Sequence, residues 1–156
     1  KKQIQTTEQL AKIQFEFDEN EAEITEDQIP QLFAIRQYLI NNPHILIQVN
    51  GFADKSEYLK VNDPSLENMI KKFPRFQKVE RNLINKDYIR LDMARSLYVI
   101  EYFLQGGIAP HRISGTSSLY KSKYKERRYM NRKVTFSYDL IRSERYMRLI
   151  NEQTRN

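Results

Sequence analysis

The sequence predicts an α/β fold, in the form of a two-layer α+β sandwich with helices on one face of a mixed sheet. Two observations lead to this prediction. Strand-like alternation and helical periodicity follow each other in the order β-α-β-α-β-β, interrupted by one long polar insertion. The chain has 156 residues, of which 40% are hydrophobic and 29% charged, a composition typical of a globular domain with a substantial core.

The N-terminal part predicts one strand and one helix. Residues 1–11 are polar and predict a lead-in without a regular element. Residues 12–18 alternate apolar and polar side chains, which is typical of a half-buried strand. The next helix begins near Ile29, after a capping box formed by Thr25 and Gln28, and ends at an Asn-Asn-Pro sequence.

The stretch 44–54 is apolar on both sides of its alternation and predicts a strand inside the sheet. It delivers a carboxylate, Asp54, at its C-terminal end, where α/β proteins commonly bind ligands. The strongest helix covers 88–105, because apolar residues recur there at helical spacing and two glycines follow. Two further strands are expected over 112–116 and 132–138.

We expect a single domain over 1–156, with its core in 12–138 and a basic, helical tail in 139–156. The region 55–87 interrupts the core and is read as an insertion with a short helix over 65–72. A connection of this length in a compact domain is usually functional or mobile. The insertion leaves the core at the end of the predicted strand, at Asp54, and returns just before the strongest helix. We therefore expect it to border any site at the end of that strand.

Positive charge gathers toward the C-terminus. The net charge is +6, but residues 1–54 hold four Lys or Arg and nine Asp or Glu. Residues 119–156 hold 11 Lys or Arg and four Asp or Glu. This distribution favours an anionic partner, such as nucleic acid, lipid head groups or an anionic cell-wall polymer.

Several kinds of chemistry are not supported by the sequence. It has no cysteine, so disulfides and thiolate metal sites are excluded. Its two histidines, His44 and His111, stand alone without clustered carboxylates, and no nucleophile motif or glycine-rich phosphate loop is present. We therefore expect no enzyme activity, no cofactor and no metal site.

Three motifs in order resemble the OmpA-like peptidoglycan-binding domain. The strand IQVNGFAD ends in Asp54, the helix start LDMARS presents Arg95, and RYMNRKV over 128–134 precedes the last strand. The resemblance covers roughly residues 12–138 apart from the insertion. It implies the OmpA-like fold and a noncatalytic site for peptidoglycan, which anchors a larger cell-envelope protein or complex to the wall.

The resemblance also implies which residues form the site. The free end of diaminopimelate in the stem peptide carries an ammonium and a carboxylate on one carbon. Asp54 would accept from the ammonium, and Arg95 would hold the carboxylate bidentately. Additional donors and the wall of the site would come from Asn131, Arg132, Phe52, Ala53 and Leu91.

The family implies a location in the periplasm of a Gram-negative bacterium, within a protein associated with the outer or the inner membrane. Other envelope proteins are further expected partners, through the 55–87 insertion and the basic tail. No nucleic-acid partner is expected. Three positions depart from the family pattern and are expected to alter affinity and ligand preference, namely Glu57 near a usual glycine, Tyr88 near a usual asparagine and Asp92 in place of serine.

Two alternatives stay open at this stage. In the first, Asp54 and Arg95 form a salt bridge that only ties loop to helix, and the domain is a degenerate OmpA-like module for protein interaction in a membrane-associated complex. The second concerns aromatic residues placed among Lys and Arg. They could stack nucleic-acid bases or anchor the insertion to the core, and they are Phe73, Phe76, Tyr120, Tyr124 and Tyr129.

Overall fold

A computed structural model describes residues 3–60, 63–74, 84–85, 88–122 and 124–141. The N-terminal half contains α1 (Thr7–Ala11), β1 (Gln14–Glu16), η1 (Glu26–Gln28), α2 (Ile29–Asn41) and β2 (Ile45–Asp54). The middle contains β3 (Leu59–Lys60), α3 (Pro64–Lys72), β4 (Ile84–Asn85), β5 (Tyr88–Ile89) and α5 (Leu91–Gln105). The remaining elements are η2 (Pro110–Arg112), β6 (Ile113–Tyr120), η3 (Lys125–Asn131) and β7 (Lys133–Leu140).

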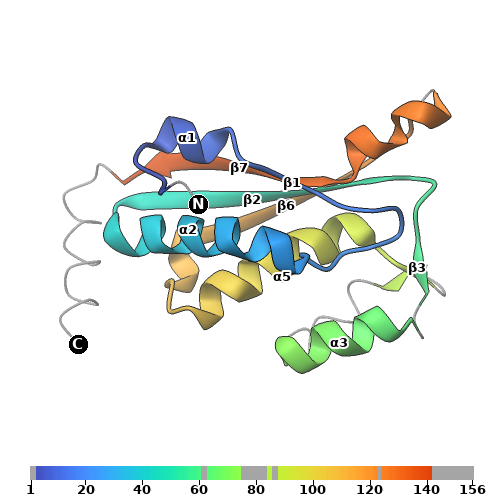
Figure 1. The fold of residues 1–156 in the computed structure, drawn as a ribbon, viewed down its shortest axis with the longest axis horizontal. Coiled ribbons are helices and arrows are strands. Elements are labelled where there is room, and N and C mark those ends of the chain that lie inside the picture. Colours follow the sequence, from blue (N-terminus) through green and yellow to red (C-terminus); the bar gives the residue numbers. More distant parts are fainter. Residues whose placement is uncertain (1–2, 61–62, 75–83, 86–87, 123, 142–156) are drawn as a thin grey trace.

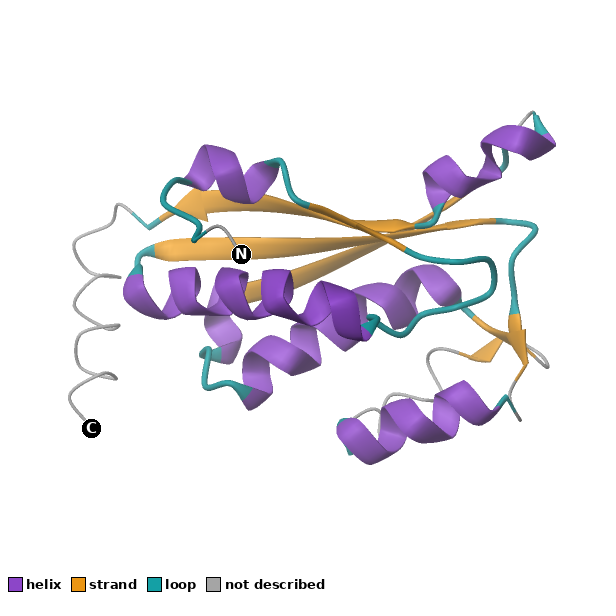
Figure 2. Ribbon diagram, in the orientation of Figure 1, coloured by secondary structure: helices purple, strands orange, loops and turns teal. Residues whose placement is uncertain are grey.

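The main sheet has the strand order β1-β7-β2-β6. β2 pairs with β6 in parallel and with β7 antiparallel, and β1 pairs antiparallel with β7. Helices α2 and α5 lie together against the sheet, and α1 lies beside β7 (Figures 1 and 2). The predicted mixed sheet and two-layer α+β arrangement are therefore confirmed.

Strand β2 is the centre of the core, as its apolar alternation predicted. Ile45, Ile47 and Val49 are buried, and the strand pairs on both edges along most of its length. Gly51 lets α5 approach this strand closely: a Cβ there would lie 2.1 Å from the Asp92 carbonyl oxygen. The absent side chain therefore brings the first turns of α5 against the C-terminal half of β2.

Helix α5 begins later than its periodicity predicted. Tyr88 belongs to the short strand β5, and Arg90 is the N-cap of a helix that starts at Leu91. The Arg90 guanidinium pairs with the buried Asp92 carboxylate, at 3.2 Å from Nε and 2.6 Å from Nη2. A carboxylate in the first turn of a helix is favoured by the helix dipole, which explains how Asp92 is accommodated.

The insertion holds a helix close to the predicted one. Asp63 caps α3 by accepting from the Ser65 backbone N–H, and the helix buries Leu66 and Met69. Phe73 follows the helix and packs edge-on against Tyr98 of α5, with ring centroids 4.9 Å apart. The described parts of the insertion therefore pack on α5, and a small sheet of order β3-β5-β4 joins its two ends.

Other boundaries differ from prediction. The lead-in contains the helix α1, whose N-cap Thr6 and Gln9 form a reciprocal capping box. Strand β6 extends to Tyr120, and the connection after it contains the 3-10 segment η3. The helix predicted for the C-terminal tail lies outside the described residues. Within the part of the chain that is described, no helix has the length and apolar character needed to cross a membrane.

Candidate functional site

The Asp54 carboxylate lies at the C-terminal end of β2 with 1% of the residue exposed. It accepts from the Ser56 backbone N–H at 2.9 Å and from the Ser56 hydroxyl at 2.6 Å. Its other oxygen accepts from the Ser122 backbone N–H at 3.2 Å and from the Asn131 side-chain amide at 2.9 Å. Asp54 thus joins the end of β2 to Ser122 and Asn131, which are 68 and 77 residues away in sequence.

These hydrogen bonds keep Asp54 ionised. Burial acts to raise the pKa of Asp54, but the bonds from Ser56, Asn131 and Ser122 outweigh it and bring the pKa below its ordinary value. All of these donors are uncharged, and among the described residues Asp54 is in no ion pair. The site therefore contains an ionised carboxylate that is held by hydrogen bonds from uncharged donors and forms no ion pair with a described cation.

Arg95 lies on α5 and is completely buried. Its Nε donates to the Glu21 carbonyl at 2.7 Å, and its two Nη atoms donate to the carbonyls of Phe52 at 3.0 Å and Asp18 at 3.3 Å. The Nη atoms also donate to the two oxygens of Glu57, at 3.0 and 2.6 Å. All five N–H donors of this guanidinium have partners within the chain.

Glu57 is the residue that links the two predicted site residues. Its carboxylate pairs bidentately with Arg95, with both side chains at most 1% exposed. The same carboxylate accepts from the backbone N–H of Asp54 at 2.9 Å and of Asn20 at 3.0 Å. The direct Asp54–Arg95 salt bridge considered from the sequence is wrong, because Glu57 is the partner of Arg95.

The other predicted site residues are divided between this cluster and its surroundings. Asn131 contacts Asp54 directly, and Ala53 and Leu91 are buried in the core. Phe52 stacks on Tyr120, with ring centroids 5.7 Å apart. Arg132 reaches toward Glu19 at 4.0 Å, and its Nε has no hydrogen-bond partner among the described residues.

A groove of about 380 Å³ adjoins the cluster. It is lined by residues from the first part of the insertion, from the start of α5 and from the end of β6, namely Lys55, Glu57, Tyr58, Ile89, Arg90, Leu91 and Leu119. Glu57 therefore separates Arg95 from a groove that reaches the surface. The expectation that the insertion borders the predicted site agrees with this lining.

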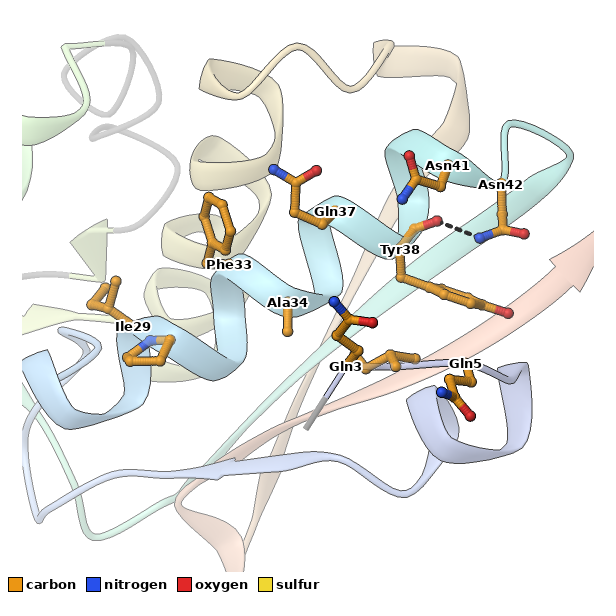
Figure 3. A pocket seen from close by; sticks show the side chains of 11 residues that line it. Gln3, Gln5, Ile29, Phe33, Ala34, Gln37, Tyr38, Asn41 and Asn42 are labelled. Atoms are coloured by element: carbon orange, nitrogen blue, oxygen red, sulfur yellow. Dashed lines mark hydrogen bonds between the residues drawn. The ribbon is translucent and has the colours of Figure 1, made fainter. Parts of the chain in front are cut away.

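A larger cavity of about 730 Å³ lies elsewhere, between α2 and the segment before α1. Figure 3 shows its lining, in which Phe33, Ala34 and Tyr38 of α2 lie among the amides of Gln37, Asn41 and Asn42. Among the described residues that line it, none is a predicted site residue and none is charged. Although this cavity is larger than the groove beside Glu57, its lining does not support it as the candidate site.

Sequence reasoning placed Asp54 and Asn131 together correctly and did not foresee the role of Glu57. The one available signal was its position, three residues after Asp54, where the family usually has a glycine. A side chain with a carboxylate at such a place is within reach of any cation that meets the end of β2. The remaining partners of Arg95 are backbone carbonyls, which no side-chain motif can reveal.

The fold is shared with solved structures of several bacterial proteins. A MotB-like protein from Desulfovibrio vulgaris matches 80% of this chain and 69% of its own, with 22% identity and a TM-score of 0.55. The peptidoglycan-associated lipoprotein from Burkholderia pseudomallei matches 83% of this chain and 92% of its own, with 18% identity and a TM-score of 0.54. The cell wall anchor of the Pseudomonas aeruginosa type VI secretion system matches 82% and 79%, with 15% identity and a TM-score of 0.51.

No protein-family model matches this sequence, and no curated protein does. The three solved structures are OmpA-like domains, and the chain has the OmpA-like fold that its motifs predicted.

Proposed function

We propose that this domain binds peptidoglycan without catalysis and anchors a larger cell-envelope protein or complex to the cell wall in the periplasm. The shared fold supports this proposal, because two of the similar domains are described as peptidoglycan-associated and as a cell wall anchor. Two residues at the matching motif positions, Asp54 and Arg95, belong to one cluster that Glu57 bridges.

The observation that carries the proposal is the bidentate pair of Arg95 and Glu57. It demonstrates that a carboxylate fits the fork of Arg95 while touching the backbone of Asp54. The carboxylate of diaminopimelate has the same shape and charge. We infer that it enters from the adjoining groove and replaces Glu57, which would then turn toward the groove that it already lines.

Asp54 would bind the neighbouring ammonium. Its carboxylate is already ionised and accepts only from uncharged donors in the described structure. An ammonium can donate three hydrogen bonds and carries a full charge, so it would compete effectively with the Ser122 and Asn131 donors. Asn131 and Arg132 would then remain close enough to contact the ligand.

One observation favours a second function, a degenerate domain that serves protein interaction. Every donor of Arg95 is already engaged, and neither Arg95 nor Glu57 is exposed. A ligand must therefore displace a buried ion pair before it can use Arg95, which weakens its affinity. If this cost is too great, the cluster serves only to hold the loops together.

The test is co-sedimentation of the chain with purified peptidoglycan sacculi. Asp54→Asn is expected to lower affinity by about 10- to 150-fold, the usual effect of losing a charge-assisted bond in a sheltered site. Asp139→Asn is the matched control, because Asp139 is exposed on β7 and its one hydrogen bond among the described residues comes from the adjacent Leu140 backbone N–H. Equal affinity of both variants, or no binding by the unaltered chain, would favour the interaction module.

A further inference from the structure

Residues 119–122 and 124–133 form a projection at one end of the molecule, which we call the tip. Figure 1 shows η3 extending past the ends of β2 and β6, away from both helices that cover the sheet. Three tyrosines and a methionine of the tip are between 48% and 57% exposed, namely Tyr120, Tyr124, Tyr129 and Met130. These aromatic residues therefore do not anchor the insertion to the core, whereas Phe73 does.

The tip is also strongly basic. Its described residues include six Lys or Arg and a single acidic residue, Glu126. Lys121, Lys125 and Arg127 are exposed, and none of them forms an ion pair with a described residue. The Arg127 guanidinium lies over the Tyr124 ring, 5.5 Å from the ring centroid. The Lys133 ammonium lies over the Phe52 ring in the same way, at 5.3 Å. Charge and exposed aromatic surface are thus interleaved.

The base of the tip is held at both ends by one group. Asp54 accepts from the backbone N–H of Ser122, which precedes η3, and from the side chain of Asn131, the last residue of η3. The Lys55 backbone N–H also donates to the Tyr120 carbonyl at 2.8 Å. The tip is therefore attached to the end of the sheet as a defined unit and does not hang from a free loop.

We propose that the tip binds the surface of an anionic phospholipid bilayer. Tyrosine has an apolar ring and a polar hydroxyl, and it is favoured at the boundary between head groups and acyl chains. Lys and Arg close to an anionic leaflet are attracted to its head groups. The exposed Met130 and Leu119 suit an acyl boundary, and they offer little to a nucleic acid, which needs stacking faces along a basic groove. The groove beside Glu57 reaches Leu119 but includes no residue of η3.

The test is co-sedimentation of the full chain with lipid vesicles. One set contains phosphatidylcholine alone, and in the other a third of the lipid is phosphatidylglycerol. The chain is expected to sediment with the anionic vesicles and to stay in the supernatant with the neutral vesicles. Binding is expected to weaken as salt is raised from about 0.1 M to about 1 M, because the Debye length falls from about 10 Å to about 3 Å.

Two variants separate the contributions. Lys125→Gln with Arg127→Gln is expected to lower affinity by about 25-fold, since each basic residue near such a surface contributes about fivefold. Tyr129→Ser with Met130→Ser is expected to lower it by about tenfold at every salt concentration, because apolar contact is not screened. All four residues are exposed or in an exposed segment, so unchanged melting temperatures should accompany these losses.

The matched control is Lys12→Gln with Lys71→Gln, which removes two exposed charges outside the tip and should change affinity by less than about twofold. Equal loss in the control and tip variants, or equal binding to neutral vesicles, would overturn the proposal. Tighter binding to a single-stranded oligonucleotide than to anionic vesicles would overturn it in favour of nucleic acid. The experiment contains no peptidoglycan, so its outcome is separate from that of the wall-binding proposal.

Discussion

The Glu57 carboxylate accepts hydrogen bonds from both Nη atoms of Arg95, at 3.0 and 2.6 Å, and neither side chain has meaningful contact with solvent. This pair gives a buried cation a fixed internal partner. It also means that any external carboxylate for Arg95 must first compete with one that is covalently part of the chain. The effective concentration of the Glu57 carboxylate at Arg95 is high because both belong to one chain. A ligand carboxylate must therefore displace Glu57, and its observed affinity includes the free energy of that displacement.

Removal of Glu57 should therefore change stability and binding in opposite directions. Glu57→Ala leaves the Arg95 charge buried without its counter-ion and is expected to lower the free energy of unfolding by about 3–5 kcal/mol. If diaminopimelate uses Arg95, the same change should increase affinity for soluble muropeptide, because the fork is vacant. Urea unfolding and a muropeptide titration on one preparation measure both effects. Reduced stability without increased affinity would indicate a purely structural pair.

Arg95 itself should be a major determinant of stability. Arg95→Ala leaves the Glu57 carboxylate buried alone and removes the donors to the carbonyls of Asp18, Glu21 and Phe52, so a loss of about 3–5 kcal/mol is expected. The double variant with Glu57→Ala should lose less than the sum of the two single losses, since no lone charge remains. Additive losses in a double-mutant cycle would contradict the pairing.

The ionised state of Asp54 predicts a dependence of stability on acid. Its pKa is lower in the folded state than in the unfolded chain, where an Asp titrates near 3.9. A depressed pKa contributes stability that is complete above the unfolded value and is lost as pH falls through the folded one. Urea midpoints measured from neutral pH down to about pH 2 should therefore fall less steeply below pH 4 in Asp54→Asn than in the unaltered chain. Parallel curves would show that the folded and unfolded pKa values are equal.

Gly51 should tolerate no side chain. A methyl group there would lie 2.1 Å from the Asp92 carbonyl oxygen and 2.8 Å from the Ser96 Cβ, so β2 and α5 must separate. Gly51→Ala is expected to cost about 1–3 kcal/mol or more. Gly115→Ala on the neighbouring strand β6 is the control, because its nearest obstacle is the end of the flexible Ile100 side chain, at 2.8 Å. Similar urea midpoints for the two variants would show that the close approach at Gly51 is not required.

Local patterns predicted the parts of the fold that depend on local physics. The alternation around Ile47 and Val49 and the periodicity of 91–105 reflect which faces are buried, and these follow from spacing alone. The helix α1 was missed although Thr6 and Gln9 form a capping box, because five residues are too few to show a helical period. The short strands β3 and β5 pair across the insertion and have no local signature.

The contacts of the candidate site could be predicted only where both side chains belong to the sequence motifs. Asp54 and Asn131 meet because one ends β2 and the other precedes its partner β7, which the order of elements implies. The contact of Arg95 with Glu57 joins residues 38 apart, through an insertion whose path the sequence does not define. The Arg95–Glu57 contact follows from the three-dimensional arrangement and from no local sequence pattern.

The attachment of the tip through Asp54 would make the two proposed binding events share one acceptor. An ammonium that takes over the Asp54 oxygens would release the Ser122 or Asn131 donors, and the tip would then keep only part of its attachment, including the Lys55–Tyr120 backbone bond. A tip with fewer contacts to the sheet would lose more conformational entropy on settling against a lipid surface. If both proposals hold, the wall and the membrane would therefore be antagonistic ligands of this domain. Thermodynamic linkage requires the antagonism to be reciprocal, with vesicles weakening muropeptide binding by the same factor by which muropeptide weakens vesicle binding. The Asp54 carboxylate would in this way couple the binding of a wall ligand to the binding of a lipid surface.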